Sequence, residues 1–165
     1  MPNGSRGDIY TLNYKKEKYA DPVKVADPKP GLLCSYYKAF FKSTLLINGK
    51  PDSSFTINSI TVPSSVKAPS FGLQYRGYID IPAKGIYSFY LTCDDGGILK
   101  IAGSETVNND GLHSAIEKNG QVALRKGLHP FALDFIEGGG GFTLKLKYSI
   151  NGSSPQEIPS SWFKN

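Results

Sequence analysis

Apolar and polar residues alternate along several segments of the chain, most clearly in Phe71–Ile81. A period of two predicts a β-strand with one buried face, and Pro82, which lacks a backbone donor, ends this strand. Ile86–Cys93 repeats the pattern, so that one face carries Tyr87, Phe89, Leu91 and Cys93. No segment shows a sustained helical period. The pattern therefore predicts an all-β protein.

Shorter strands are predicted at Leu32–Tyr37, Ile98–Ile101, 105–107, 113–117, 121–125, Leu128–Ile136 and Phe142–Ile150. Much of segment 42–70, which is rich in Ser, Pro and Asn, is predicted to be a loop. Asp94–Gly97 is predicted to reverse the chain between two strands, and Glu137–Gly141 to close the last hairpin. Many short strands separated by glycine turns favour a two-sheet antiparallel β-sandwich or a barrel-like closed sheet.

The composition agrees with this fold class. The 165 residues are the length of about one domain. They include 18 Gly and 11 Pro, which disfavour long helices. With 39% hydrophobic and 20% charged residues, the chain is neither disordered nor a membrane span, and we expect no membrane insertion.

The first thirty residues differ from the rest. Ile9–Tyr14 alternates like a single strand, and prolines 22, 28 and 30 then predict a stiff, extended connector. A lone strand is not stable by itself, so it either docks on the body or ends a preceding domain. We favour the second, and expect residues 1–30 to be an arm and linker and residues 31–165 to be the β-sandwich domain.

The formal net charge of +5 raises the question of a nucleic-acid partner. The basic residues are not clustered: the longest run is Lys15–Lys18, which contains Glu17, and in Thr143–Tyr148 the lysines alternate with apolar residues. Phosphate binding needs a clustered basic surface, so we expect no nucleic-acid partner. Cys34 and Cys93 either form a long-range disulfide or are two small buried thiols.

The common enzyme motifs are absent from the sequence. It has no Gly-x-Ser-x-Gly elbow, no HExxH and no phosphate-binding glycine loop followed by Lys-Ser/Thr. His129 lies on the same face of its predicted strand as apolar residues and is interpreted as a buried, hydrogen-bonded histidine. His113 follows a turn and has no nucleophile pattern nearby. A carboxylate pair of the glycosidase type remains an alternative, but we expect this chain not to be an enzyme.

The acidic turn Asp94–Gly97 has two interpretations. Asp-Gly is a common hairpin turn, and aspartate side chains cap their own turns. Alternatively, two adjacent carboxylates supply hard oxygen ligands for Ca²⁺, and the glycine loop 137–141 exposes backbone carbonyls that complete the shell. Open coordination positions would then suit sugar hydroxyls.

At these residues the chain resembles a known family, the PA-fourteen (protective-antigen-type) domain. The resemblance covers about 31–165 and rests on six ordered blocks: Gly31–Tyr37, Tyr75–Pro82, Gly85–Ile101, Asn109–His113, Leu124–Pro130 and Asp134–Gly141. It implies a β-sandwich of roughly barrel shape, found in glycosidases, toxins and fungal adhesins and often the glycan-binding part.

The resemblance also implies site residues. In calcium-dependent adhesins of the family two adjacent aspartates hold the ion, and these fall on Asp94 and Asp95. A third ligand, an asparagine in those adhesins, falls on Glu137, and carbonyls come from around Gly139 and Gly141. The resemblance thus implies calcium as the candidate cofactor and a glycan contacting Asp94, Asp95, Glu137 and Gly139.

Bacterial β-N-acetylhexosaminidases similar to this chain carry a PA-fourteen domain after a small sandwich, whose last strand Arg6–Tyr14 resembles. The implied function is a non-catalytic, carbohydrate-binding accessory domain of an exported bacterial glycoside hydrolase, with a glycan and the parent's catalytic domain as partners. The alternative is a structural spacer, or a domain that shapes the parent's active site, with no ligand of its own.

Overall fold

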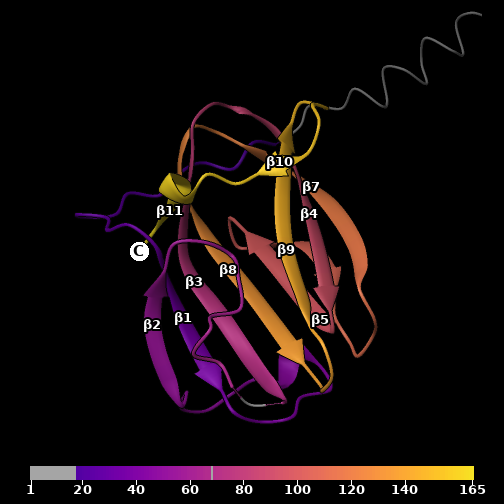
Figure 1. Cartoon of the computed structure of the whole chain (residues 1–165). Helices are drawn as coiled ribbons and strands as arrows, with labels where there is room; N and C mark the ends of the chain where they lie inside the picture. The colour runs from indigo at the N-terminus through magenta and orange to yellow at the C-terminus, as the bar shows by residue number, and fades with distance from the viewer. Residues whose placement is uncertain (1–17, 68) are drawn as a thin grey trace, which may run out of the picture.

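The computed structural model describes residues 18–67 and 69–165, which form two antiparallel sheets packed face to face (Figure 1). The larger sheet has the order β2 (Ser53–Ile57), β1 (Leu32–Tyr37), β3 (Phe71–Ile81), β8 (Gly127–Glu137), β5 (Gly96–Ile101) and β6 (Ser104–Asn109), with β11 (Phe163–Lys164) also paired to β3. The smaller has the order β10 (Gln156–Glu157), β9 (Thr143–Ile150), β4 (Gly85–Asp94) and β7 (Ile116–Leu124). Two short 3-10 helices, η1 (Thr44–Leu46) and η2 (Ser160–Trp162), complete the described elements.

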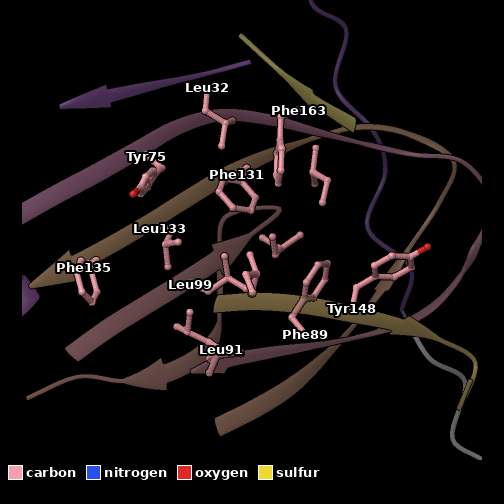
Figure 2. Packing of buried hydrophobic residues seen from close by; sticks show 14 of the residues in the cluster. Leu32, Tyr75, Phe89, Leu91, Leu99, Phe131, Leu133, Phe135, Tyr148 and Phe163 are labelled. Atoms are coloured by element: carbon pink, nitrogen blue, oxygen red, sulfur yellow. The ribbon is translucent and has the colours of Figure 1, made fainter. Parts of the chain in front are cut away.

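The two-sheet antiparallel sandwich predicted from the alternation is confirmed, whereas closure into a barrel is not, because the sheets remain separate. The alternating apolar positions of both sheets meet between the layers (Figure 2). The hydrophobic side chains with no exposed surface are Leu73, Tyr75, Ile79 and Ile81 in β3, and the predicted Tyr87, Phe89, Leu91 and Cys93 in β4. Burial of these side chains, each worth about 2 kcal/mol, holds the sheets together.

Both predicted hairpins at the glycine turns are wrong. β4 lies in the smaller sheet and β5 in the larger one, so Asp95 connects two sheets. Likewise, β8 pairs with β3 and β5, while β9 pairs with β4, so loop 138–142 also crosses between sheets. Aspartate and glycine predict a sharp reversal but do not say whether the next strand pairs with the last. As a result, both loops lie at the same end of the sandwich.

Two strand boundaries also differ from the prediction. β2 lies inside the segment predicted to be mostly loop, where it pairs with β1 from Leu32 to Tyr36. β7 runs unbroken through Asn119-Gly120, the gap between the two strands predicted at 113–117 and 121–125. A Cβ at position 120 would collide with the backbone carbonyl oxygen of Thr106 in β6. This glycine therefore permits a close approach of the two sheets' edges and is not a turn residue.

The described part of the linker, residues 18–30, lies against the body. The backbone N–H of Ala20 donates to the carbonyl of Ala123 at 2.9 Å, and that of Val23 donates to Leu128 at 2.8 Å. These contacts are at the end where β7 finishes and β4 begins, whereas Asp94 is at the opposite end of β4 (Figure 1). The predicted strand Ile9–Tyr14 lies outside the described residues, and the boundary at residue 30 stays a prediction.

Both cysteines are buried free thiols, Cys34 in β1 and Cys93 in β4, and burial raises the pKa of each to about 12. His129 is fully buried and its Nε2 lies 2.7 Å from the carbonyl oxygen of Arg125. Among the described residues no helix has the length and apolar character needed to cross a membrane.

Candidate functional site

Three carboxylates meet where the two crossing loops begin. Asp94 is the last residue of β4, Asp95 follows it across a cis peptide bond, and Glu137 is the last residue of β8. One oxygen from each carboxylate lies within 4.8 Å of the other two. The structure thus brings together the three acidic residues of the expected site, from strands in different sheets.

Asp95 is oriented by two backbone donors. The N–H of His113 donates to its Oδ1 at 3.0 Å, and the N–H of Gly138 donates to its Oδ2 at 2.6 Å. Two hydrogen bonds of this kind fix the plane of the carboxylate. Each oxygen keeps a free lone pair, so Asp95 remains able to bind a cation.

Glu137 is almost completely buried, with 1% of its surface exposed. Its Oε1 accepts a hydrogen bond of 3.0 Å from the N–H of Gly139, but its Oε2 has no hydrogen-bond partner. Burial raises the pKa of the Glu137 carboxyl to about 7, and a side-chain hydrogen bond between the protonated carboxyl and Asp95, with the charges of Asp95 and Asp94, adds to the rise. A buried carboxylate with one unsatisfied oxygen is costly, and a bound cation would remove that cost.

The residues present fit a calcium ion. Calcium takes six to eight oxygen ligands, and Asp94, Asp95 and Glu137 supply three negative charges in one place. Gly139 and Gly140 have positive φ angles of 131° and 89°, a conformation that glycine adopts freely. Side chains are thereby absent from this loop, which leaves its backbone open to solvent; Gly139 also uses its N–H to hold Glu137.

A residue that sequence reasoning did not assign to the site is His113. Its ring bridges two backbone carbonyls, with Nε2 2.9 Å from the oxygen of Asn109 and Nδ1 2.8 Å from that of Ser114. The ring therefore holds the loop between β6 and β7, whose backbone N–H contacts Asp95. Only the block Asn109–His113, noted in the sequence for its resemblance, pointed to this loop, and nothing in it indicated the contact with Asp95.

Apolar side chains flank the carboxylates. Phe40 and Leu112 are 53% and 46% exposed, and both lie beside Gly138: a Cβ placed there would be 2.9 Å from Leu112 Cδ2, 3.4 Å from Phe40 Cε2 and 3.2 Å from Asp95 Oδ2. Phe142, half exposed, packs edge-on against Phe71 with ring centroids 5.9 Å apart. The site thus combines one buried and two half-buried acidic groups with exposed apolar ones, as ligand sites commonly do.

Comparison with protein families gives one match. The model of the PA14 domain matches residues 28–162, which is most of the chain and includes all three carboxylates. Among curated proteins, none is similar enough in sequence to count as a relative.

Several solved structures share the fold. The PA14 sugar-binding domain of an RTX adhesin superposes with a TM-score of 0.70 at 16% identity, covering 83% of this chain and 99% of its own. The A domain of epithelial adhesin 6 from Candida glabrata, in complex with Galβ1-3GlcNAc, superposes with a TM-score of 0.67 at 12% identity. The match covers 92% of this chain and 93% of the adhesin domain. A β-glucosidase from Kluyveromyces marxianus, in complex with glucose, superposes with a TM-score of 0.54 at 18% identity, and the match covers 73% of this chain and 16% of the β-glucosidase.

Proposed function

The chain belongs to the PA14 domain family, and on that premise we propose that it is a non-catalytic carbohydrate-binding module whose site is formed by Asp94, Asp95 and Glu137. The observation that carries the proposal is the unpartnered Oε2 of the buried Glu137, which lies beside two further carboxylates. The sugar-binding adhesin domains that share the fold support it.

The carboxylates would hold calcium, which when bound supplies open coordination positions for neighbouring sugar hydroxyls. The backbone N–H groups of His113 and Gly138 hold Asp95 in its orientation. Phe40 and Leu112 offer apolar surface to the C–H groups on one face of a sugar ring. The absence of a side chain at Gly138 lets Leu112, Phe40 and the Asp95 carboxylate lie close to the backbone of this loop.

The parent protein is proposed to be an exported bacterial glycoside hydrolase of the β-N-acetylhexosaminidase kind. The β-glucosidase that contains this fold supports the general class, since the matched part is 16% of that chain. The adhesins among the neighbours support a location outside the cell. The hexosaminidase assignment rests on the resemblance of Arg6–Tyr14 alone.

Calorimetric titration with calcium, followed by glycan binding in calcium and in chelator, tests the proposal. The wild-type protein is expected to bind calcium, to melt at a higher temperature with it, and to retain glycans only in its presence. Asp95→Asn should lose all three effects. Asp80→Asn, a carboxylate on β3 at the opposite end of the sandwich, is the matched control and should lose none. A wild-type melting temperature that calcium does not change would contradict the calcium site.

The spacer alternative is favoured by a different observation, the backbone bonding of residues 18–30 to the body. A linker held at several points fixes the orientation of the domain relative to whatever precedes it in the chain. A spacer, or a domain that shapes a neighbouring active site, needs such a fixed orientation. If no glycan bound and Asp95→Asn changed stability alone, this second function would be preferred.

A further inference from the structure

The loop between β1 and β2, residues 38–52 and here called the β1–β2 loop, brings an aromatic side chain to the carboxylates. Phe40 is about half exposed, and a Cβ placed at Gly138 would lie 3.4 Å from its Cε2 and 3.2 Å from Oδ2 of Asp95. The next side chain, that of Phe41, packs elsewhere, against a separate buried cluster formed by Tyr37, Ile47 and Ile136. This packing ties the loop to the larger sheet but not to the site.

Asp110 is the residue that ties the β1–β2 loop to the site. Its Oδ1 accepts a hydrogen bond of 2.8 Å from the backbone N–H of Thr44, and its Oδ2 accepts one from the hydroxyl of Ser43. The two donors belong to adjacent residues at the start of η1, so both oxygens of one carboxylate hold one point of the loop. In the part of the chain that the structure describes, no other hydrogen bond joins the β1–β2 loop to the loop between β6 and β7.

The loop between β6 and β7, residues 110–115, is itself fixed on the site. A Cβ at Gly96 would lie 2.4 Å from the carbonyl oxygen of Gly111, so this loop lies directly on the turn that carries Asp95. The backbone N–H of His113 also donates to the Asp95 carboxylate. One short loop therefore contacts a proposed calcium ligand and, through its first residue, the β1–β2 loop.

We propose that Asp110 is a positioning residue for glycan binding and that it acts through Phe40. By holding the start of η1, it fixes the apolar wall of the site beside the carboxylates, where one sugar ring can contact both. Asp110 is not one of the three carboxylates that meet there. A wall that is fixed before the ligand arrives loses less conformational entropy on binding than one that the ligand must order. This inference rests on the proposed function, because it assigns a further residue to the same glycan site.

Matched variants test the proposal, with affinities for sugar and for calcium measured separately. An array of N-acetylglucosamine, galactose, glucose and Galβ1-3GlcNAc, read in calcium, identifies the sugar that the wild type retains best, and calorimetry gives its affinity. Asp110→Ala and Phe40→Ala should each weaken sugar binding about fivefold and leave calcium affinity within about twofold of the wild type.

Asp110→Asn is the matched control. It removes the same negative charge, but an amide can still accept from the N–H of Thr44 and can donate to the hydroxyl of Ser43. This variant should bind the sugar as the wild type does. A loss as large as that in Asp110→Ala would show that the charge matters and not the position of the loop, and would overturn the proposal.

The double variant Asp110→Ala/Phe40→Ala separates positioning from a merely structural role. If Asp110 acts through Phe40, the double variant should bind the sugar no more weakly than Phe40→Ala alone. Losses that multiply in the double variant would overturn this inference and leave the glycan site standing. A wild type that binds calcium but none of the sugars would instead contradict the proposed function, and this inference with it.

Ser43→Ala serves if Asp110→Ala does not fold, which its melting curve would show. It removes one of the two hydrogen bonds and keeps the carboxylate, so sugar binding should weaken about twofold. In the Phe40→Ala background it should have no further effect. A further loss there would count against the proposal in the same way as a further loss in the double variant.

Discussion

The backbone N–H of His113 donates a hydrogen bond of 3.0 Å to Oδ1 of Asp95, joining a loop that follows β6 to the end of β4. The His113 ring holds that loop through contacts with the carbonyls of Asn109 and Ser114. The orientation of Asp95, a proposed calcium ligand, thus depends on His113, which contacts it through the backbone and not through the imidazole ring.

Replacement of His113 by alanine tests this dependence. The backbone N–H remains in His113→Ala, but the loop loses the ring's contacts with two carbonyls, to one of which a neutral imidazole donates. We therefore expect calcium affinity to fall several-fold and stability to fall by about 1 kcal/mol. Calcium titration and denaturant unfolding measure the two effects. Unchanged calcium affinity would show that Asp95 is held by Gly138 alone.

Stability without calcium should depend on pH through Glu137. Its pKa is raised from 4.5 to about 7, so the folded state binds more protons than the unfolded state between these values. Stability should therefore decrease as pH rises from about 4.5 to about 7, by up to roughly 3 kcal/mol, and be level above that. Glu137→Gln should abolish this slope. Urea unfolding at a series of pH values in chelator would check it.

With calcium present, the stability of the protein should increase with pH instead of decreasing. Calcium needs the ionised carboxylate, so its binding competes with the proton on Glu137 and should weaken as pH falls below about 7. Calorimetry in two buffers of different ionisation enthalpy should detect proton release when calcium binds near neutral pH. Release that persists in Glu137→Gln would mean that another group carries the proton.

Gly138→Ala should affect ligand binding more than stability. The added methyl group would press on Leu112, which is half exposed and free to move, so the loss of stability should be below about 1 kcal/mol. The same methyl would occupy the space beside Asp95, and glycan affinity should fall at least tenfold. Thermal melting and glycan binding distinguish the two. A large drop in melting temperature with normal binding would contradict this view of the glycine.

Asn109→Asp should destabilise the fold. Asn109 is 1% exposed, and its Nδ2 donates to the carbonyls of Leu91 at 3.0 Å and Ile116 at 2.8 Å, joining β6 to both β4 and β7. An aspartate of the same shape would place a carboxylate against two carbonyl oxygens, at a cost of about 2–4 kcal/mol. Chemical unfolding measures it. The loss of stability should be smaller in Asn108→Asp, because the side chain of Asn108, the preceding residue, is exposed.

The sequence predicted best what depends on neighbouring residues. Phe71–Ile81 matches β3 residue for residue because one buried face fixes its period. The predicted strand break at Asn119-Gly120 was wrong, because the glycine at position 120 is required by close contact with the backbone of Thr106. Thr106 lies in the other sheet, and no local pattern shows that contact. The hairpins failed for the same reason, since strand pairing is a long-range property.

The acidic residues of the site followed from the resemblance, and the structure places them together. The residues around them could not be found in this way. Phe40 lies in the loop between β1 and β2, whereas Leu112 and His113 lie in the loop between β6 and β7. Their own neighbours in sequence give no sign that these loops meet the carboxylates. A site built at a meeting of several loops is visible only once the sheets have positioned those loops.

The position of the linker has a mechanical consequence. Ala20 is bonded to the end of β7, and Asp94 lies at the far end of β4, so a pull between the linker and a ligand at the carboxylates runs along these two strands. β4 is paired along its length with both β7 and β9, and the bonds of an antiparallel pair are perpendicular to the strands. Such a load would shear many hydrogen bonds at once instead of unzipping them singly, which suits a domain that must hold a surface-bound ligand against force.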